Sequence, residues 1–397
     1  MRILYISTVD ISKPDGPGVN EYEFVNALKK QLGQNVSFII PKPVNPIDIE
    51  SENIIYLKGS VGSEPRLMQQ LQLVLIARRV CRESKYDLIV ARLSLLPFDI
   101  WAITKLVNVP LAIKTLGEPT LKYLRSSGGV KSYIAKILRY PNQFLLKSVV
   151  TSSIGADACT RQLTERNMKY LKIQKEGKII HIENATNTSN FFPTLDSVAK
   201  QHLKFEKFKY IVGYVGGKPW ERGGKELIEV LPILQERYPT LGVVIVGGGE
   251  GVVKLKELSK SLNVEKNCII PGEVPYKDVP KWINSFDIGV AFDLVDRMSY
   301  VGSSNQKIRQ YIACGKPVIA TPGGNHFIED ENLGTIVEHN NLTKFAEAIE
   351  HWLSLLDSEK AKHTKKAHSY AKEKLSTDYA LKERLVFWQK RISDASG

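Results

Sequence analysis

The sequence has few cysteines and no long apolar run. Its four cysteines, Cys81, Cys159, Cys268 and Cys314, lie far apart, and no pair has zinc-site or Cys-x-x-Cys spacing. No His/Cys or His/Asp cluster has metal-ligand spacing either, so the sequence predicts no bound metal. No apolar segment reaches the roughly 18 residues that span a bilayer. We therefore expect a cytoplasmic protein with reduced thiols.

The N-terminus also lacks the features of a secretory signal. Residues 1–7 become polar too soon for one and predict a first buried strand instead. The chain has 397 residues, which suits two domains of roughly 150 residues, each with a core of its own. The net charge of +13 favours an anionic partner, such as a nucleotide, a phosphate, an acidic lipid or a nucleic acid, without choosing among them.

Short apolar, β-branched runs alternate with amphipathic helical stretches along most of the chain. This alternation predicts an α/β fold class with parallel, doubly wound sheets. Expected strands are residues 3–6, 36–40, 53–57, 88–90, 111–114, 149–152, 179–182, 211–215, 243–246, 268–270, 288–292, 318–320 and 335–337. Expected helices are residues 21–32, 67–84, 224–238, 252–262, 278–285, 306–314, 342–355 and 377–392.

The pattern breaks at residues 183–209, which are rich in Asn, Thr and Ser and then in Lys and Phe. We therefore predict two Rossmann-like domains facing a cleft. The predicted parts are a domain at 1–185, a linker at 186–208, a second domain at 209–375 and a C-terminal helix at 376–397 that could cross back to the first domain.

Loops that follow strands are the candidate ligand sites, because open parallel sheets bind ligands beyond the carboxyl ends of their strands. In the first such loop, Gly16 and Gly18 precede a helix whose N-terminus can receive an anion. A tight turn without a ligand fits this loop equally well.

The loop at 215–225 combines Gly217 with Lys218 and Arg222. An arginine fork can hold two phosphate oxygens, and a lysine adds a point charge. Although surface basic residues are usually only solvated, their place beside glycines at the end of a strand favours phosphate binding.

The loop at 302–307 leads into another predicted helix. Ser304 and its neighbours can cap that helix while their N–H groups face an anion. Lys307 falls in the first turn, where a cation opposes the helix dipole unless an anion is bound. This conflict indicates function. The glycine cluster at 247–251 is interpreted as a turn, because a lone glycine match is weak support for a dinucleotide site.

Ordered segments from residue 210 to residue 336 resemble the GT-B glycosyltransferases, specifically the retaining family 4. They are YVGGKPWERGGK at 214–225, VVIVGGGEG at 243–251, PGEVPYKDVP at 271–280, SFDIGVAF at 285–292 and KIRQYIACGKPVIATPGGN at 307–325. The resemblance implies that the first domain lies on the acceptor side and that the second domain holds a nucleotide-sugar donor.

The resemblance also implies roles by position. Arg222 and Lys307 would bind the donor diphosphate, and the backbone near Val274 would meet the base. The other implied donor contacts are Gly16 and Gly18 from the first domain, and Gly217, Lys218, Ser304, Asn305, Gln306 and Gln310.

Several positions depart from the family pattern. The two glutamates that the family commonly has are here Gly302 and Gln310, whose carbonyl still accepts a hydrogen bond. The arginine that usually follows Val-Gly is Gly217, with Lys218 one place on. The usual first-domain histidine is Leu116, which leaves Glu118 as the nearest polar candidate for a catalytic role.

The implied function is the retaining transfer of a hexose, with glucose as the best guess, from a UDP-sugar to a saccharide or a lipid-linked saccharide in polysaccharide or exopolysaccharide biosynthesis. No cofactor is implied, because the nucleotide sugar is the substrate. Two alternatives stay open: a non-catalytic nucleotide-sugar sensor, and another GT-B enzyme such as a nucleotide-sugar epimerase. A nucleic-acid partner is not expected, because no recognised binding motif accompanies the charge. The oligomeric state is not predicted.

Residues 119–156 contain no acidic side chain. Basic and apolar residues interleave there, as on a helix that lies on an anionic membrane surface, although a solvated face over a core fits equally well. We therefore expect residues 119–150 to contact the cytoplasmic face of a membrane or a phospholipid-linked acceptor. The residues concerned are Lys122, Arg125, Lys131, Lys136, Arg139 and Lys147 with Tyr123, Tyr133, Ile134, Ile137, Leu138, Phe144 and Leu145.

Overall fold

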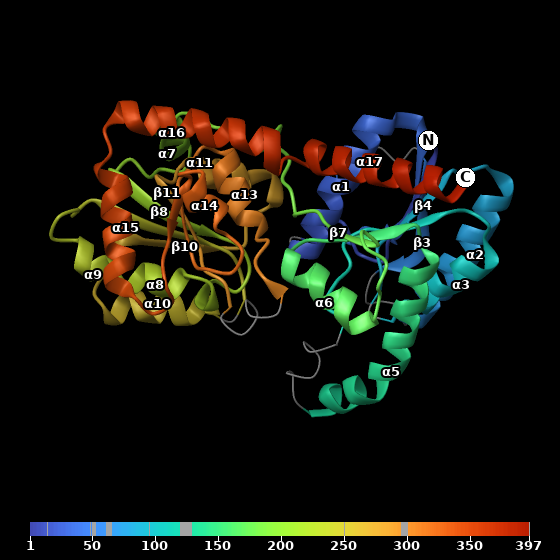
Figure 1. Cartoon of the computed structure of the whole chain (residues 1–397). Helices are drawn as coiled ribbons and strands as arrows, with labels where there is room; N and C mark the ends of the chain where they lie inside the picture. Colours follow the sequence, from blue (N-terminus) through green and yellow to red (C-terminus); the bar gives the residue numbers. More distant parts are fainter. Residues whose placement is uncertain are drawn as a thin grey trace. The chain divides into compact units, whose positions relative to one another are not determined.

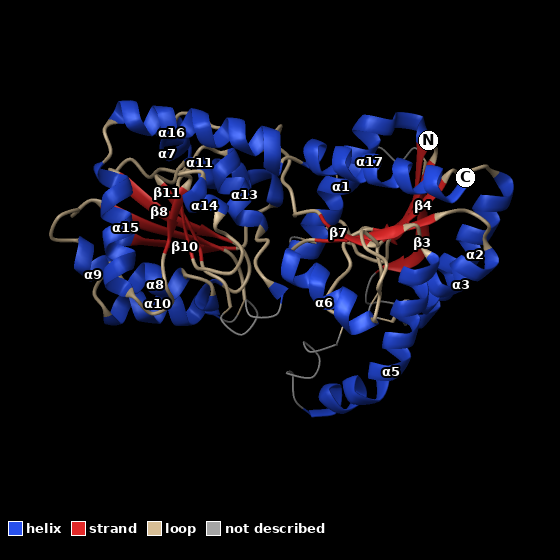
Figure 2. Ribbon diagram, viewed as in Figure 1, coloured by secondary structure: helices blue, strands red, loops and turns tan. Residues whose placement is uncertain are grey.

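The chain forms two compact units. The computed structural model describes residues 1–13, 15–47, 49, 53–60, 66–94, 96–119, 129–249, 251–294 and 301–396. The first unit is Met1–Glu183 with Ala380–Gly397, and the second is Asn184–Tyr379 (Figure 1). Each unit has a parallel sheet with helices on both faces (Figure 2). The predicted α/β, doubly wound class is therefore confirmed.

The first sheet has seven strands in the order β3-β2-β1-β4-β5-β6-β7, so its strand order reverses between β1 and β4. The strands are β1 (Ile3–Ile6), β2 (Val36–Lys42), β3 (Ile54–Ser60), β4 (Leu88–Ala91), β5 (Leu111–Ile113), β6 (Gly155–Ala158) and β7 (Ile179–His181). The helices of this unit are α1 (Gly16–Leu32), α2 (Arg66–Glu83), α3 (Phe98–Leu106), α5 (Gly129–Ser152), α6 (Arg161–Leu171) and most of α17 (Thr377–Ser396).

Two helices far apart in the sequence cover one face of this sheet. Phe24 and Leu28 of α1 join Leu381 and Trp388 of α17 in one buried cluster with strand residues such as Tyr5. On the other side α2 packs against β2 and β3, and α3 packs between α2 and α5. This division follows from right-handed crossovers, because the chain moves one way from β1 to β2 and the other way from β3 through β6.

The second sheet has six strands in the order β10-β9-β8-β11-β12-β13, and its order reverses between β8 and β11. The strands are β8 (Tyr210–Val215), β9 (Leu241–Val246), β10 (Cys268–Gly272), β11 (Ile288–Ala291), β12 (Val318–Ala320) and β13 (Gly334–Ile336). The helices are α7 (Asp196–His202), α8 (Gly224–Glu229), α9 (Leu231–Leu234), α10 (Gly251–Ser261), α11 (Val279–Asn284), α13 (Gln306–Ala313), α14 (Phe327–Asp330), α15 (Leu342–Ser354) and α16 (Asp357–Tyr370).

Central strands of this sheet carry glycines where aromatic rings lie against the backbone. A Cβ at Gly213 would lie 2.3 Å from the ring of Phe286, and one at Gly289 would lie 2.4 Å from the ring of Tyr311. Both rings are buried in the core between the sheet and the helices α11 and α13. Strands β8 and β11 are therefore held close to α13, which is the helix that begins the candidate site.

Residues 184–209 are part of the second unit. Phe191, Phe205 and Phe208 from this stretch are buried in its core, and α7 lies within it. Thr186 also forms an isolated parallel bridge with Ser376, directly before α17. The aromatic residues that end this polar stretch therefore anchor it to the second sheet.

The strand predicted at residues 149–152 is wrong, because these residues form the last turn of α5. Val149 and Val150 are buried there, so core packing overrides their β-branched preference. The strand is instead β6, a run of small residues that starts at Gly155, where a Cβ would lie 2.4 Å from the ring of Phe387. Among the helices that the structure describes, none combines the length and the apolarity needed to cross a bilayer.

A buried ion pair fixes α17 to the first sheet. Arg384 Nε donates to Asp157 Oδ1 at 3.1 Å, and Nη2 donates to Oδ2 at 2.8 Å. Both side chains are almost fully buried, and Asp157 Oδ2 also accepts from the backbone N–H of Thr115. The C-terminal helix therefore supplies the positive charge that compensates the buried carboxylate of Asp157 in β6.

We predict that Arg384→Met lowers the free energy of unfolding by about 3–5 kcal/mol, because it leaves the carboxylate of Asp157 buried and uncompensated. The double variant Arg384→Met with Asp157→Asn removes both charges and should recover part of the loss. Urea unfolding of the parent, both single variants and the double variant measures the cycle. A single Arg384→Met variant as stable as the parent would contradict this role for α17.

Candidate functional site

The candidate site of the second unit lies where its strand order reverses. The loop after β8 leads through Gly216 to Arg222, and the loop after β11 contains Asp293 and ends at the start of α13. Both loops therefore leave carboxyl ends of neighbouring parallel strands, which is where doubly wound sheets bind ligands.

Four buried polar atoms in these two loops have no hydrogen-bond partner among the residues that the structure describes. They are Lys307 Nζ, Arg222 Nε, Asp293 Oδ2 and Ser303 Oγ. Buried polar groups in folded proteins are almost always paired, and a cluster of exceptions indicates a group that the protein alone does not supply. Two of the four atoms belong to basic side chains, an arrangement that suits an anion.

Hydrogen bonds connect the two loops. Arg222 Nη1 donates to Asn305 Oδ1 at 3.3 Å, and Asn305 Nδ2 donates to Asp293 Oδ1 at 2.7 Å. The backbone N–H of Asp293 donates to Thr321 Oγ1 at 2.9 Å, beyond β12. The predicted residues Arg222 and Asn305 are thus brought together, and Asp293 orients the amide between them.

Lys307 lies at the centre of the site. Its side chain is 7 % exposed, and its Nζ lies 3.9 Å from the centroid of the Tyr214 ring. A Cβ at Gly216 would lie 3.1 Å from this Nζ, so the glycine makes room for the amine. Burial and the nearby Arg222 hold the pKa of Lys307 well below its usual range, although Asp293 opposes them.

The site has more basic than acidic side chains. Lys307 and Arg222 supply two basic groups against the single carboxylate of Asp293. In addition, α13 begins here, and its N-cap residue Asn305 makes no side-chain capping bond. The free N–H groups of its first turn add partial positive charge. The arrangement suits an anion with two charges, such as a pyrophosphate.

Ser304 and Gln306 have other partners in this structure. Ser304 Oγ accepts from the backbone N–H of Asn184 at 3.1 Å, and Gln306 Nε2 donates to the carbonyl of Ala185 at 2.6 Å. The buried Arg309 donates to the carbonyl of Asn184 at 2.8 Å. These side chains hold the segment at 184–185 against α13, and their contact with a ligand stays a prediction.

The remaining predicted donor residues of this unit lie around the same loops. Gln310 is buried, and its Nε2 donates to Tyr276 Oη at 3.3 Å. Val274 packs against the core beneath. Gly217 and Lys218 are exposed, and Lys218 has a left-handed backbone with φ of 56° before the short turn at Pro219–Glu221. Lys218 is therefore free to meet solvent or a ligand.

The first unit holds the other predicted residues. Asp15 caps α1, and its Oδ1 accepts from the N–H of Gly18 at 2.7 Å, so that N–H is already used. A Cβ at Gly18 would lie 2.3 Å from the carbonyl of Lys13, whereas Gly16 faces open space. Gly16 and Gly18 lie in the first turn of α1, and their contact with a diphosphate stays a prediction.

Glu118 has a partner as well. Its Oε1 accepts from Arg166 Nε of α6 at 3.1 Å, and the neighbouring Gly117 carbonyl accepts from Asn167. Leu116, at the position where the family has a histidine, is buried. Glu118 stays a candidate for contact with the sugar or the acceptor, with one carboxylate oxygen engaged.

Sequence reasoning missed Asp293 and Tyr214. Asp293 follows a buried strand directly, and the rule about carboxyl ends of strands could have identified it. Tyr214 lies inside a strand. Its contact with Lys307 joins residues far apart in the chain, so no local sequence pattern predicts it. Among the described residues, no group of three or more His, Cys, Asp or Glu side chains could hold a metal ion.

The comparisons with known proteins agree on one class. Residues 197–374 match the family model described as glycosyl transferases group 1. A GDP-mannose-dependent alpha-(1-6)-phosphatidylinositol monomannoside mannosyltransferase of Mycolicibacterium smegmatis is 24 % identical over 176 residues, which are 43 % of this chain and 45 % of that protein. The chain thus spans less than half the length of this relative.

Solved structures match nearly the whole chain. Sucrose-phosphate synthase of Thermosynechococcus elongatus has a TM-score of 0.73 at 18 % identity, covering 98 % of this chain and 99 % of that one. Anabaena Alr3699/HepE in complex with UDP and glucose has a TM-score of 0.66 at 17 % identity, covering 97 % and 99 %. Similarity at this level of identity shows the fold, and the expected GT-B fold is confirmed.

We predict that Lys307→Met raises the free energy of unfolding of the ligand-free protein by about 1–3 kcal/mol, because it removes an unpaired buried amine at nearly constant volume. Urea unfolding without ligand measures the difference. Lys225→Met, which changes a more exposed lysine at the start of α8, is the control. A Lys307→Met variant that is less stable than the parent would mean that the amine serves the fold.

Proposed function

We propose that the protein, a GT-B-fold chain whose residues 197–374 match glycosyl transferases group 1, is a glycosyltransferase that uses a nucleotide-sugar donor. The observation that carries the proposal is the cluster of unpaired buried atoms at Lys307, Arg222 and Ser303. A diphosphate would supply the oxygens that these donors lack, and it is the part that all nucleotide-sugar donors share.

The proposed reaction is a retaining transfer. The bond between the sugar C1 and the β-phosphate oxygen breaks, and a bond from C1 to an acceptor hydroxyl oxygen forms on the same face. The acceptor proton passes to a donor phosphate oxygen, so no separate base is required. Lys307, Arg222 and the first amides of α13 stabilise the charge that develops on the leaving diphosphate.

We propose a UDP-sugar as the donor, with glucose as the sugar. Support comes from Anabaena Alr3699/HepE, which has this fold and was solved with UDP and glucose. The mycobacterial relative is described as GDP-mannose-dependent, so a GDP-sugar is the alternative donor. Val274 would meet the base, and Gln310 would accept a ribose hydroxyl through its carbonyl.

The acceptor that we propose is a saccharide or a lipid-linked saccharide at an anionic membrane surface, in polysaccharide assembly. Four side chains on α5, spaced as one helix face, support this: Tyr133, Ile137, Tyr140 and Phe144 are between 57 % and 72 % exposed. Lys136, Arg139 and Lys147 are exposed beside them. Residues 120–128 of the predicted contact lie outside the described residues, as do the side chains of Lys131 and Ile134.

Helix α2 adds a second apolar face to the same unit. Leu67, Met68, Leu71 and Leu75 are all at least half exposed, and they fall within about 100° of one another around the helix axis. The helix has no acidic residue before Glu83 and carries Arg79 and Arg82 near its end. Exposed apolar faces with basic and no acidic neighbours suit an anionic lipid surface.

A nucleotide-sugar sensor without transfer activity is the second candidate function. It is favoured by Gly302 and Gln310, which stand where the family commonly has glutamates. Release of free nucleoside diphosphate from a labelled donor separates the two, because a sensor binds the donor without turning it over.

We predict that UDP or a UDP-sugar raises the melting temperature of the protein more than any other nucleotide in a panel. A ligand at about one hundred times its Kd adds roughly 2.7 kcal/mol to the free energy of unfolding. Arg222→Gln and Lys307→Met should each reduce the response, and the control Lys225→Gln should keep it. Variants that respond like the parent would remove the phosphate assignment.

We also predict that the parent protein sediments with vesicles of phosphatidylglycerol and phosphatidylcholine but not with phosphatidylcholine alone. Tyr140→Ser combined with Phe144→Ser should reduce the bound fraction several-fold, because both side chains are exposed on α5. Val253→Ser, which changes an exposed apolar residue on α10 of the second unit, is the control. Equal absence of binding to both vesicle types would refute the membrane contact.

A further inference from the structure

The first unit has a strand reversal of its own, between β1 and β4. Arg92 follows β4 directly, and the loop after β1 leads into α1. The carboxyl ends of β1, β4 and β5 therefore surround Arg92 in the place where a doubly wound sheet binds a ligand.

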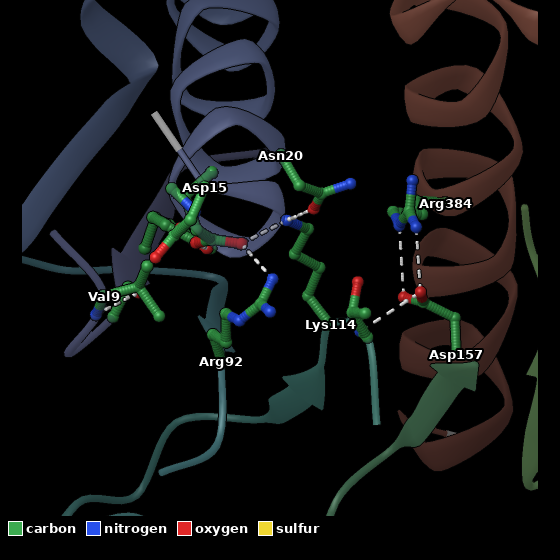
Figure 3. A network of polar contacts seen from close by, with 12 residues as sticks. Val9, Asp15, Asn20, Arg92, Lys114, Asp157 and Arg384 are labelled. Carbon is green, nitrogen blue, oxygen red and sulfur yellow. Dashed lines mark hydrogen bonds and ion pairs between the residues drawn. The ribbon is translucent and has the colours of Figure 1, made fainter. Parts of the chain in front are cut away.

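A buried carboxylate lies beneath this reversal. Glu21, in the second turn of α1, is fully buried and accepts hydrogen bonds from Tyr5, Lys114 and Arg92. Figure 3 labels the two basic side chains, Lys114 and Arg92. Burial alone would raise the pKa of Glu21, but Lys114 and Arg92 hold it at about 2. Glu21 is therefore ionised, and its charge fixes both basic side chains.

The charges of this network do not cancel. Among the described residues, Lys114, Arg92 and Arg384 pair with two carboxylates, Glu21 and Asp157, and Arg384 with Asp157 forms a bidentate pair. Lys114 is 1 % exposed and also donates to Asn20 Oδ1 at 2.7 Å. Three basic side chains and two carboxylates leave one positive charge without a carboxylate partner. This charge belongs to the basic side chain that reaches solvent.

That group is Arg92. Its side chain is 16 % exposed, and only Nη1 has a partner among the described residues, Glu21 Oε1 at 2.6 Å. The other guanidinium N–H groups remain available. An arginine fixed on one edge by a buried carboxylate can present its other edge as a fork to a planar or tetrahedral anion, with little loss of side-chain freedom on binding.

We propose that Arg92 binds an anionic group of the acceptor, a phosphate or a carboxylate, and that Glu21 is the positioning residue that holds it. This inference rests on the proposed transferase function, which requires an acceptor. It narrows the acceptor to molecules that carry a negatively charged group near the reacting hydroxyl. The same oxygen chemistry could also come from the donor diphosphate, so the test separates the two sources.

The test measures thermal stabilisation of the full chain by inorganic phosphate and by glycerol 1-phosphate, against sodium chloride at equal ionic strength. The arms are the parent, Arg92→Gln, Arg222→Gln and Arg79→Gln, an exposed arginine on α2. The deciding comparison is made in the Arg222→Gln background, where the candidate diphosphate site no longer contributes to phosphate binding. We expect both probes to stabilise Arg222→Gln alone and Arg222→Gln with Arg79→Gln. Arg222→Gln with Arg92→Gln should bind them at least about tenfold more weakly, which is the effect of losing one charge-assisted contact.

The other outcomes overturn either the inference or the proposed function. Probe binding that survives Arg92→Gln in the Arg222→Gln background, or that is absent from the parent, means that Arg92 only completes a structural network. Thermal stabilisation by UDP is measured in the same variants. If Arg92→Gln weakens UDP binding as much as probe binding, Arg92 contacts the donor and not the acceptor. Failure of UDP to bind the parent overturns the proposed function alone, because the probe arms do not need a nucleotide.

If Arg92→Gln does not fold, Arg92→Lys provides the same test. It keeps the charge beside Glu21 and removes the fork, so it should fold and still bind the probes more weakly than the parent.

Discussion

A buried amine without a partner is the constraint on which the candidate site depends. Lys307 Nζ lies over the Tyr214 ring and beside Gly216, and the described residues offer it no hydrogen bond. Burying such a group costs free energy unless another group compensates it. The surrounding features suggest that a bound ligand compensates this cost. Asn305 holds Arg222, and the N-terminus of α13 has no side-chain cap.

The two units use one architecture in different ways. In the second unit, two loops at the strand reversal leave basic atoms unpaired. In the first unit, the reversal lies over a carboxylate that pairs with most of the charge around it and leaves one side of Arg92 free. The first arrangement suits a strongly charged diphosphate, and the second suits a single anionic group, as we propose for the donor and the acceptor.

Much of this could be predicted from the sequence, because buried parallel strands and strand-end loops leave local patterns. Arg222 and Lys307 were found from their loops, and the conflict of Lys307 with the helix dipole was the informative signal. Residues 149–152 were misassigned, since only the core decides whether a short β-branched run is helical. Ser304 and Gln306 hold the segment at 184–185, and Asp293 aligns Asn305. Such contacts join distant residues and leave no local pattern.

Proton uptake on UDP binding tests the central claim most directly. The pKa of Lys307 lies well below its usual range in the free protein, and a bound phosphate must raise it, so binding draws in a proton at a pH between the two values. Calorimetric titration in two buffers of different ionisation enthalpy, repeated at a series of pH values, measures this uptake. The account predicts uptake in the parent and none in Lys307→Met. UDP binding to the parent with the same heat in both buffers would contradict it.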